Sequence, residues 1–305
     1  MSKVRQGPRS RMLASVVALV GATATGAAPA DVIQHDFFST ALGGEMRYSV
    51  YVPPGYDDAG AQRYPVVYLL HGVGDNNKAW VKRGKVEESS DRLIASGELM
   101  PFIAVMPAAK TSWFVDSADV NGPGNYATAV REDLVRHIDE TYRARTDRGG
   151  RAIAGLSMGG FGAIRLALEH PDTYVAAAGM SSALWLHVKS DTVLNERQER
   201  IFNGSFGTPF QAERFLRQSP SAYFEQAAAL KNPPALYITA GDDDRFRAYR
   251  SSTLLYSAMR EAGIEAQLRI TDGDHVWPTW AAALPDVLRF FASFWAAAGG
   301  GGKTP

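Results

Sequence analysis

The chain has no cysteine, no excess of charge of either sign and no apolar run long enough to cross a bilayer. Without cysteine, disulfides, thiolate nucleophiles and cysteine-ligated metals are excluded. Lys and Arg together number 32, as do Asp and Glu, and no basic stripe is present, so we expect no nucleic-acid partner. With 46% hydrophobic residues among 305, the chain can bury the core of one large domain or two small ones.

Residues 1–30 have the pattern of a secretory signal peptide. Four basic residues come first, the apolar run Met12 to Val20 follows, and Ala28-Pro29-Ala30 supplies the small residues of a cleavage site. The apolar run is too short for a stable membrane-spanning helix. We therefore expect a secreted or periplasmic protein. Because no disulfide is possible, its stability would come from its core.

Strand-like and helix-like segments alternate along the rest of the chain. Tyr64 to Leu70, Met100 to Met106 and Ala235 to Ala240 are continuous apolar runs, typical of strands buried on both faces. Tyr126 to Tyr142 has apolar residues at helical spacing. The alternation predicts an α/β fold with a mostly parallel central sheet, helices on both faces and a site at the carboxyl ends of the strands. The expected parts are a catalytic domain at 31–297, a cap-like helical insertion within it at 183–232 after the sixth strand, and a disordered tail at 298–305.

Gly155-Leu156-Ser157-Met158-Gly159 matches G-x-S-x-G, the nucleophile elbow of a strand–turn–helix unit. The apolar run Ala152 to Ala154 precedes it, and a helical segment from Phe161 to His170 follows. In such a turn the serine oxygen projects above the sheet, and glycines on both sides remove side chains that would collide. The pattern predicts Ser157 as a nucleophile. A glycine-rich turn without chemistry is the alternative, since Gly and Ser are common residues.

A serine nucleophile needs a base, and on this kind of sheet the order along the chain is serine, acid, histidine. Three histidines follow Ser157: His170, His187 and His275. His170 ends the elbow helix, where a capping role is expected. His187 has no strand-end carboxylate between it and the serine. His275 follows both an acidic strand end and a further strand, so we predict that His275 is the base.

The acid is predicted at the end of the Ala235 to Ala240 strand, where Asp242, Asp243 and Asp244 are adjacent. A turn at this point makes it uncertain which carboxylate faces the histidine, so the pattern leaves all three open. Asp272 and Asp274 are less favoured because they lie too close to the histidine along the chain.

The oxyanion intermediate of acyl transfer needs two backbone N–H donors. The first is expected from Met158, which directly follows the nucleophile. The second is expected from the loop after the Leu70 strand, where Gly72 and Gly74 flank Val73 and allow its backbone to approach a substrate closely.

Four motifs together resemble the esterase D family of α/β-hydrolases over residues 35–297. That family includes S-formylglutathione hydrolases, feruloyl and acetylxylan esterases, and mycolyltransferases. The resemblance implies an α/β-hydrolase fold that needs neither a metal nor a cofactor. It also implies Asp244 as the acid and Val73 as the second oxyanion residue. The motifs are Leu69-Leu70-His71-Gly72, the elbow from Gly155 to Gly160, Gly241-x-x-Asp244 and His275-x-Trp277.

Two aromatic segments also resemble family positions near the substrate, namely Ser112 to Asp116 and Trp277 to Trp280. The resemblance makes Trp113, Phe114 and Trp277 candidate substrate-binding residues. Packing in the core is the alternative role for these rings.

The sequence therefore predicts a secreted serine carboxylesterase with a Ser-His-Asp triad. Feruloyl or acetyl esters of plant polysaccharide suit an exported enzyme with several tryptophans. Acyl transfer of the mycolyltransferase type is an alternative. S-formylglutathione hydrolysis is a weaker one, because that substrate is intracellular. A non-catalytic binding protein on a hydrolase scaffold is disfavoured by the complete triad. Oligomeric state is not predicted.

Overall fold

A computed structural model describes residue 1 and residues 30–299 of the chain. The signal-peptide prediction therefore lies almost entirely outside the described residues. The final helix continues to Gly299, so the first two residues of the expected tail are helical, and the remainder of that tail lies outside the described part. Among the described residues, no helix has both the length and the apolar composition to cross a membrane.

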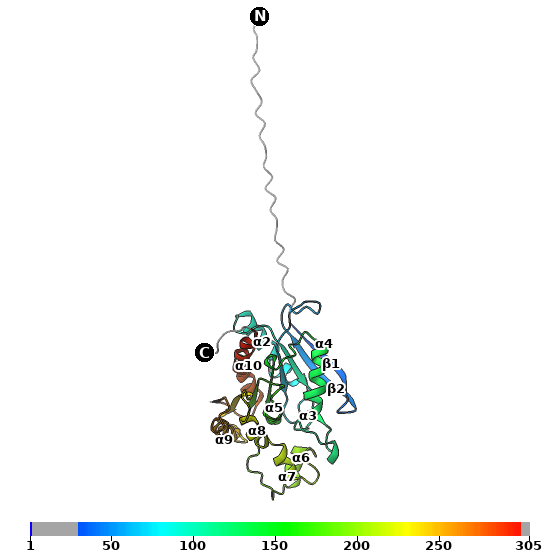
Figure 1. The fold of residues 1–305 in the computed structure, drawn as a ribbon, viewed down its shortest axis with the longest axis vertical. Coiled ribbons are helices and arrows are strands. Elements are labelled where there is room, and N and C mark those ends of the chain that lie inside the picture. Colours follow the sequence, from blue (N-terminus) through cyan, green and yellow to red (C-terminus); the bar gives the residue numbers. More distant parts are fainter. Residues whose placement is uncertain (2–29, 300–305) are drawn as a thin grey trace.

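An eight-stranded sheet forms the centre of the molecule (Figure 1), with the strand order β1-β2-β4-β3-β5-β6-β7-β8. β1 pairs antiparallel with β2 and β2 antiparallel with β4, whereas every other pairing is parallel. The predicted mostly parallel sheet is confirmed. The strands are β1 (Asp31–Ser39), β2 (Gly44–Val52), β3 (Val66–Leu70), β4 (Ile103–Pro107), β5 (Arg151–Leu156), β6 (Ala176–Met180), β7 (Ala235–Gly241) and β8 (Ala266–Thr271).

The central strands are apolar throughout because both faces of the sheet are covered. In β3 every residue is buried. Val66, Tyr68 and Leu70 contribute to the core on one face, and Val67 and Leu69 to the core on the other. This alternation follows from the twofold period of side chains along a strand. The edge strands β1 and β8 are partly exposed, because each has a neighbouring strand on one side only.

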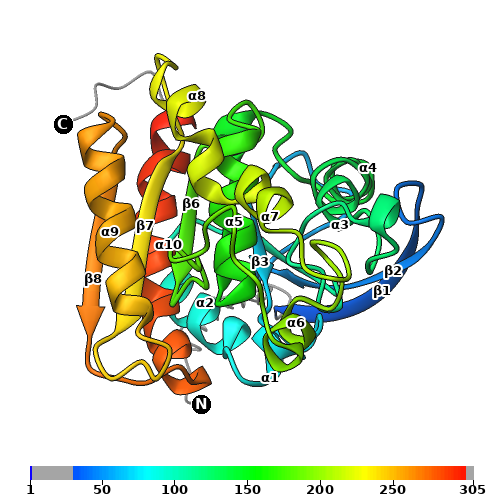
Figure 2. The same cartoon turned by 90° about the horizontal axis from the view of Figure 1, so that it is seen from below.

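Helices cover the sheet in two layers (Figure 2). One face carries α3, α4, α5, α9 and the insertion, and the other carries α1, α2 and α10. The predicted helix over 126–142 is present, with a π-helical segment (Ala129–Leu134) between α3 and α4. The helices are α1 (Ala79–Lys82), α2 (Val86–Ala95), α3 (Tyr126–Thr128), α4 (Val135–Thr141), α5 (Met158–Glu169), α6 (Glu196–Phe202), α7 (Ala212–Gln218), α8 (Phe224–Ala228), α9 (Ala248–Glu261) and α10 (Trp277–Gly299).

The insertion at 183–232 follows β6, as predicted, and contains α6, α7 and α8. A group of rings, called here the aromatic cluster, joins it to the main domain. Within this cluster the ring centroids of Trp113 and Phe202 lie 4.7 Å apart, and those of Phe161 and Phe215 lie 5.9 Å apart. The insertion therefore shares the core of the domain. The aromatic cluster comprises Trp113, Phe161, Trp185, Phe202, Phe206 and Phe215.

Candidate active site

Ser157 occupies the turn between β5 and α5 with φ 53° and ψ −116°. A non-glycine residue rarely adopts a positive φ, and such strain is concentrated at functional sites. Neighbouring backbone groups hold this conformation. The Ser157 N–H donates to the Met180 carbonyl at 2.9 Å, and the Ala183 N–H donates to the Ser157 carbonyl at 3.0 Å. The hydroxyl is thereby placed, partly exposed, above the ends of β5 and β6.

Two glycines make this turn possible. A Cβ atom on Gly155 would collide with the backbone of Gly159. A Cβ atom on Gly159 would collide with the carbonyl groups of Leu70 and His71. The collisions are with backbone atoms, which cannot move aside as the end of a flexible side chain can. The spacing of the G-x-S-x-G motif is therefore a steric requirement of strand, turn and helix meeting at one point.

The loops after β7 and β8 bring an acid to a histidine. His275 Nδ1 lies 2.7 Å from Asp244 Oδ2, and Asp244 is only 2% exposed. The second carboxylate oxygen, Asp244 Oδ1, accepts the Phe246 N–H at 2.9 Å. Asp242 and Asp243 are exposed on the same loop. Asp244 is thus the one of the three adjacent aspartates that contacts the histidine.

The pKa of the Asp244 carboxyl lies below its ordinary value. Burial alone would raise this pKa, but the hydrogen bond and positive charge of His275 and the Phe246 amide outweigh burial. Asp244 is therefore ionised at neutral pH. An ionised acid at Nδ1 keeps the proton of a neutral imidazole on that nitrogen, which leaves Nε2 free to accept a proton.

Two aromatic rings contact the imidazole of His275. Trp280, which is 6% exposed, lies 5.0 Å away between ring centroids, with the planes at 90°. Phe246, which is 70% exposed, lies 4.8 Å away at 85°. The exposed ring places an apolar surface beside the proposed base. Sequence reasoning missed Phe246, although it is the only apolar residue in the charged segment Asp242 to Arg247.

Ser157 and His275 lie at the same edge of the sheet, because β5, β6, β7 and β8 are consecutive and parallel. Among the described residues, no hydrogen bond joins the Ser157 hydroxyl to His275. Nucleophile–base contacts are often long without substrate and shorten in the Michaelis complex. The structure therefore contains the Asp244–His275 contact of the predicted triad and places the predicted nucleophile at the same edge of the sheet.

The two predicted oxyanion donors have free amides. Met158 is the first residue of α5, so its N–H has no partner within the helix. Within the described chain, neither this amide nor that of Val73 donates to a protein acceptor. A Cβ atom on Gly72 would lie 3.6 Å from Ser157 Cβ, so the loop carrying Val73 rests against the elbow. The positive end of the α5 dipole also favours negative charge here.

The predicted substrate-binding residues divide into two groups. Trp113 and Phe114 are 1% and 0% exposed, and Trp113 Nε1 donates to the Ile201 carbonyl at 3.0 Å. A direct substrate contact by these two rings is therefore not supported, and we assign them to packing. Trp277 is partly exposed, and the Arg83 guanidinium lies 4.8 Å from the centroid of its ring. It remains a candidate for substrate contact.

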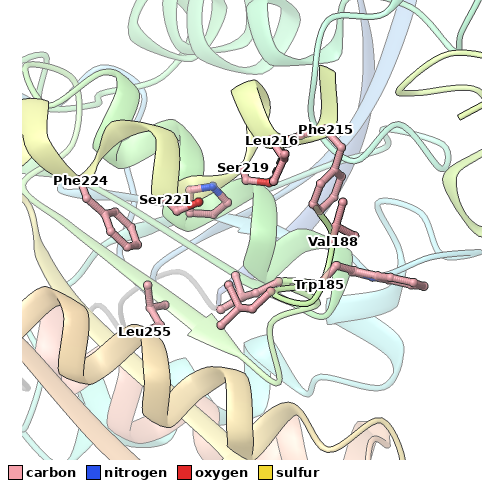
Figure 3. Close-up of a pocket in the computed structure, with 11 residues that line it drawn as sticks. Trp185, Val188, Phe215, Leu216, Ser219, Ser221, Phe224 and Leu255 are labelled. Carbon is pink, nitrogen blue, oxygen red and sulfur yellow. Dashed lines mark hydrogen bonds between the residues drawn. The ribbon is translucent and has the colours of Figure 1, made fainter. Parts of the chain in front are cut away.

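A cavity of about 60 Å³ lies between the insertion and α9 (Figure 3). Figure 3 shows Trp185, Phe215 and Leu255 around it, which ties the cavity to the aromatic cluster. The lining is Leu184, Trp185, Leu186, Val188, Phe215, Leu216, Ser219, Pro220, Ser221, Phe224 and Leu255.

Three carboxylates approach one another near the acid loop. Oxygen atoms of Asp242, Asp243 and Asp272 lie within 4.8 Å of one another, and all three residues are exposed. Asp242 Oδ1 accepts the Gly273 N–H at 3.2 Å, so the turn itself accounts for its position. An exposed acidic turn of this kind gives no reason to assign a metal to the reaction.

One protein family matches most of the chain. Its description is "Putative esterase", and the match spans residues 39–291. The chain belongs to this esterase family. The predicted resemblance to esterases of the α/β-hydrolase fold is thereby confirmed.

Relatives of this esterase include two curated esterases. An endo-1,4-beta-xylanase/feruloyl esterase from Xylanibacter ruminicola is 35% identical over 148 residues, which is 47% of this chain and 20% of the relative. An acetyl esterase from Caldicellulosiruptor saccharolyticus is 22% identical over 243 residues, which is 77% of this chain and 86% of the relative. The chain thus spans only a fifth of the first relative.

Solved structures show the same fold. A ferulic acid esterase superposes with a TM-score of 0.72 at 31% identity, covering 87% of this esterase and 98% of its own chain. An S-formylglutathione hydrolase from Staphylococcus aureus superposes with a TM-score of 0.67 at 18% identity, covering 88% and 98%. At that identity the second likeness shows the fold alone. The family and the ferulic acid esterase support a serine ester hydrolase.

Proposed function

We propose that this esterase is a secreted serine carboxylesterase that acts through Ser157, His275 and Asp244 and an acyl-enzyme. The observation that carries the proposal is the 2.7 Å contact between His275 Nδ1 and the buried Asp244, at the same edge of the sheet as a serine held at positive φ. An acid that orients a base and a nucleophile on a strained turn are the parts that serine acyl transfer requires. Secretion rests on the signal-peptide pattern of residues 1–30.

In the proposed mechanism, His275 Nε2 removes the hydroxyl proton as Ser157 Oγ attacks the ester carbonyl carbon. The carbonyl π electrons move to oxygen, and the Met158 and Val73 amides stabilise this oxyanion. The intermediate collapses, the bond to the alkoxy oxygen breaks, and His275 donates its proton to the leaving alcohol. Asp244 stabilises the imidazolium between these steps.

Deacylation repeats the same chemistry with water. His275 removes a proton from a water molecule, whose oxygen attacks the acyl carbon, and the tetrahedral intermediate again forms at the two amides. Its collapse breaks the bond to Ser157 Oγ, which recovers the proton from His275. The acid product leaves, and the enzyme returns to its starting state. An alcohol in place of water would give acyl transfer by the same steps.

We infer that the substrates are feruloyl or acetyl esters of plant polysaccharide. The ferulic acid esterase, matched over nearly its whole length at 31% identity, supports the aromatic acyl group. The partly exposed Trp277 and the exposed Phe246 offer rings against which a planar acyl or sugar group could pack. Both are adjacent to the base, since Phe246 contacts His275 and Trp277 follows it by two residues.

The nucleophile assignment is tested by Ser157→Ala. Turnover of 4-nitrophenyl acetate should fall by roughly four to six orders of magnitude, as triad removal does in other serine hydrolases. A fluorophosphonate probe should label the wild type at Ser157 and leave the variant unlabelled. Ser190→Ala, at an exposed serine of the insertion, is the matched control and should behave as wild type. Wild-type turnover by Ser157→Ala would refute the mechanism.

The substrate class is tested separately on the wild-type enzyme. Methyl ferulate, acetylated xylan, a long-chain 4-nitrophenyl ester and S-formylglutathione are compared by kcat/KM, and product analysis with added sugar detects acyl transfer. A preference for methyl ferulate or acetylated xylan is the expected result. A preference for S-formylglutathione, or a transfer product that exceeds the free acid, would overturn the substrate assignment while leaving the triad intact.

A further inference from the structure

The loops that carry the acid and the base lie against each other along their backbones. The Asp242 N–H donates to the Thr271 carbonyl at 2.9 Å, and the Asp243 N–H donates to the Gly273 carbonyl at 3.1 Å. A Cβ atom on Gly241 would collide with the Gly273 carbonyl, which shows how closely the loops approach. The distance between the proposed acid and base therefore depends on how these two loops are held together.

One side chain bridges the loops next to both proposed catalytic residues. Asp274 Oδ1 accepts the backbone N–H of His275 at 2.5 Å and the backbone N–H of Arg245 at 2.9 Å. Arg245 directly follows Asp244 in the chain, so the two amides flank the acid–base pair. Asp274 Oδ2 also lies 3.0 Å from the Arg245 guanidinium.

We propose that Asp274 is a positioning residue that sets the acid loop against the base loop and so holds His275 on Asp244. The proposal rests on the proposed triad. By binding one amide on each loop, the carboxylate limits the freedom of both segments to slide or separate. Because Nδ1 of His275 is fixed by Asp244, any movement of one loop would also change where Nε2 points. Misplacement of a reacting group by about 1 Å can cost about a hundredfold in rate.

The ion pair between Asp274 and Arg245 does not explain this arrangement. The two side chains are 40% and 54% exposed, and exposed ion pairs contribute little to folding stability. The two backbone amides, by contrast, belong to the catalytic loops themselves. They also hold the pKa of the Asp274 carboxyl below its ordinary value, so the carboxylate is charged while the enzyme works.

Three variants separate positioning from charge pairing. Asp274→Ala removes the acceptor for both amides. Asp274→Asn keeps one oxygen that can accept them but removes the charge. Arg245→Ala removes the ion pair and a 3.4 Å contact from the guanidinium to the His275 carbonyl, and keeps both backbone amides and the carboxylate. Each full-length variant is assayed on 4-nitrophenyl acetate for kcat and KM, with the thermal unfolding midpoint measured alongside.

The expected result is that Asp274→Ala lowers kcat by about ten- to a hundredfold with KM and the unfolding midpoint nearly unchanged. Asp274→Asn should recover most of the lost kcat, and Arg245→Ala should resemble the wild type. Wild-type kcat in Asp274→Ala would overturn the positioning role. So would an equal loss in Arg245→Ala, which would make the Arg245 side chain responsible, or a loss in Asp274→Ala fully accounted for by unfolding.

The triad proposal has its own control in the same assay. If Ser157→Ala is inactive and Asp274→Ala is fully active, the positioning role fails and the proposed function stands. If Ser157→Ala remains active, the proposed function fails, whatever the result at Asp274.

Discussion

His71 Nδ1 donates a 2.8 Å hydrogen bond to the carbonyl oxygen of Gly72, which belongs to the same peptide unit as the Val73 amide. The other ring nitrogen, Nε2, accepts the Ala109 N–H at 3.0 Å. A carbonyl can only accept and an amide N–H can only donate, so the two partners define one neutral tautomer. Since a peptide unit is planar, holding its carbonyl also holds the direction of the Val73 N–H.

His71→Ala should therefore weaken the proposed oxyanion hole without touching the proposed triad. Loss of one complete oxyanion donor costs about a hundred- to a thousandfold in kcat, and a misdirected donor should cost less, about tenfold. His71→Asn, which keeps a donor near the Nδ1 position, should lose less than His71→Ala. Val73→Ala retains the amide and serves as the control, with nearly wild-type kcat. Equal kcat in His71→Ala and wild type would show that the imidazole does not orient this amide.

The buried imidazole of His71 also makes folding stability depend on pH. Burial lowers the pKa of His71 below the ordinary histidine value. The partial burial of His137 lowers its pKa as well. An unfolded histidine binds a proton near its ordinary pKa of about 6.5, whereas folded His71 stays neutral. Its contribution to the free energy of unfolding is therefore fully present above about pH 6.5 and decreases as the pH falls toward the folded-state pKa.

Urea unfolding at a series of pH values from about 8 to about 5 measures this effect, because that range brackets the ordinary histidine pKa. The free energy of unfolding of the wild type should decline on the acid side. In His71→Asn, which starts from lower stability, the decline should be shallower, because one histidine with a lowered pKa is gone. Parallel declines in the two proteins would contradict the assignment.

Local steric rules made the strand–turn–helix elbow at Ser157 predictable. The requirement for glycine at Gly155 and Gly159 comes from backbone atoms within the same strand–turn–helix unit, so a short motif contains it. The buried strands were equally accessible, since β3 is apolar on both faces over a few consecutive residues. Helix α1 (Ala79–Lys82) was not predicted because a single turn is too short to show a helical period.

Contacts between distant segments decided what the residues alone left open. The choice among Asp242, Asp243 and Asp244 depends on how the β7 loop meets the β8 loop, about thirty residues further along the chain. The burial of Trp113 depends on phenylalanines of the insertion, such as Phe202, which lie still further away in the sequence. Neither relationship has a local signature, so the prediction of Asp244 as the acid came from family resemblance, and the burial of Trp113 came from the structure.

Trp113→Ala should lower stability rather than substrate binding. The ring is fully packed in the aromatic cluster, and removing a buried Trp typically costs about 3–5 kcal/mol. Thermal unfolding should shift down by about 10 °C, whereas KM for methyl ferulate in the folded protein should change little. Trp277→Ala is the matched variant at a partly exposed ring and should show a small thermal shift with a raised KM. A normal unfolding midpoint with raised KM in Trp113→Ala would instead place that ring in the substrate site.

Asp244→Asn should reduce kcat by about 10⁴-fold, the loss seen when the acid of a serine protease triad is made neutral. The amide has nearly the same shape, but it cannot stabilise the imidazolium, and its NH₂ group favours the wrong tautomer of His275. Asp242→Asn and Asp243→Asn are the matched controls, since both side chains are exposed and neither contacts the histidine. Both should keep kcat within roughly twofold of wild type, and surface substitutions of this kind also change folding stability little. Circular dichroism establishes that each variant is folded. A large loss in Asp243→Asn with an active Asp244→Asn would move the acid to the neighbouring residue.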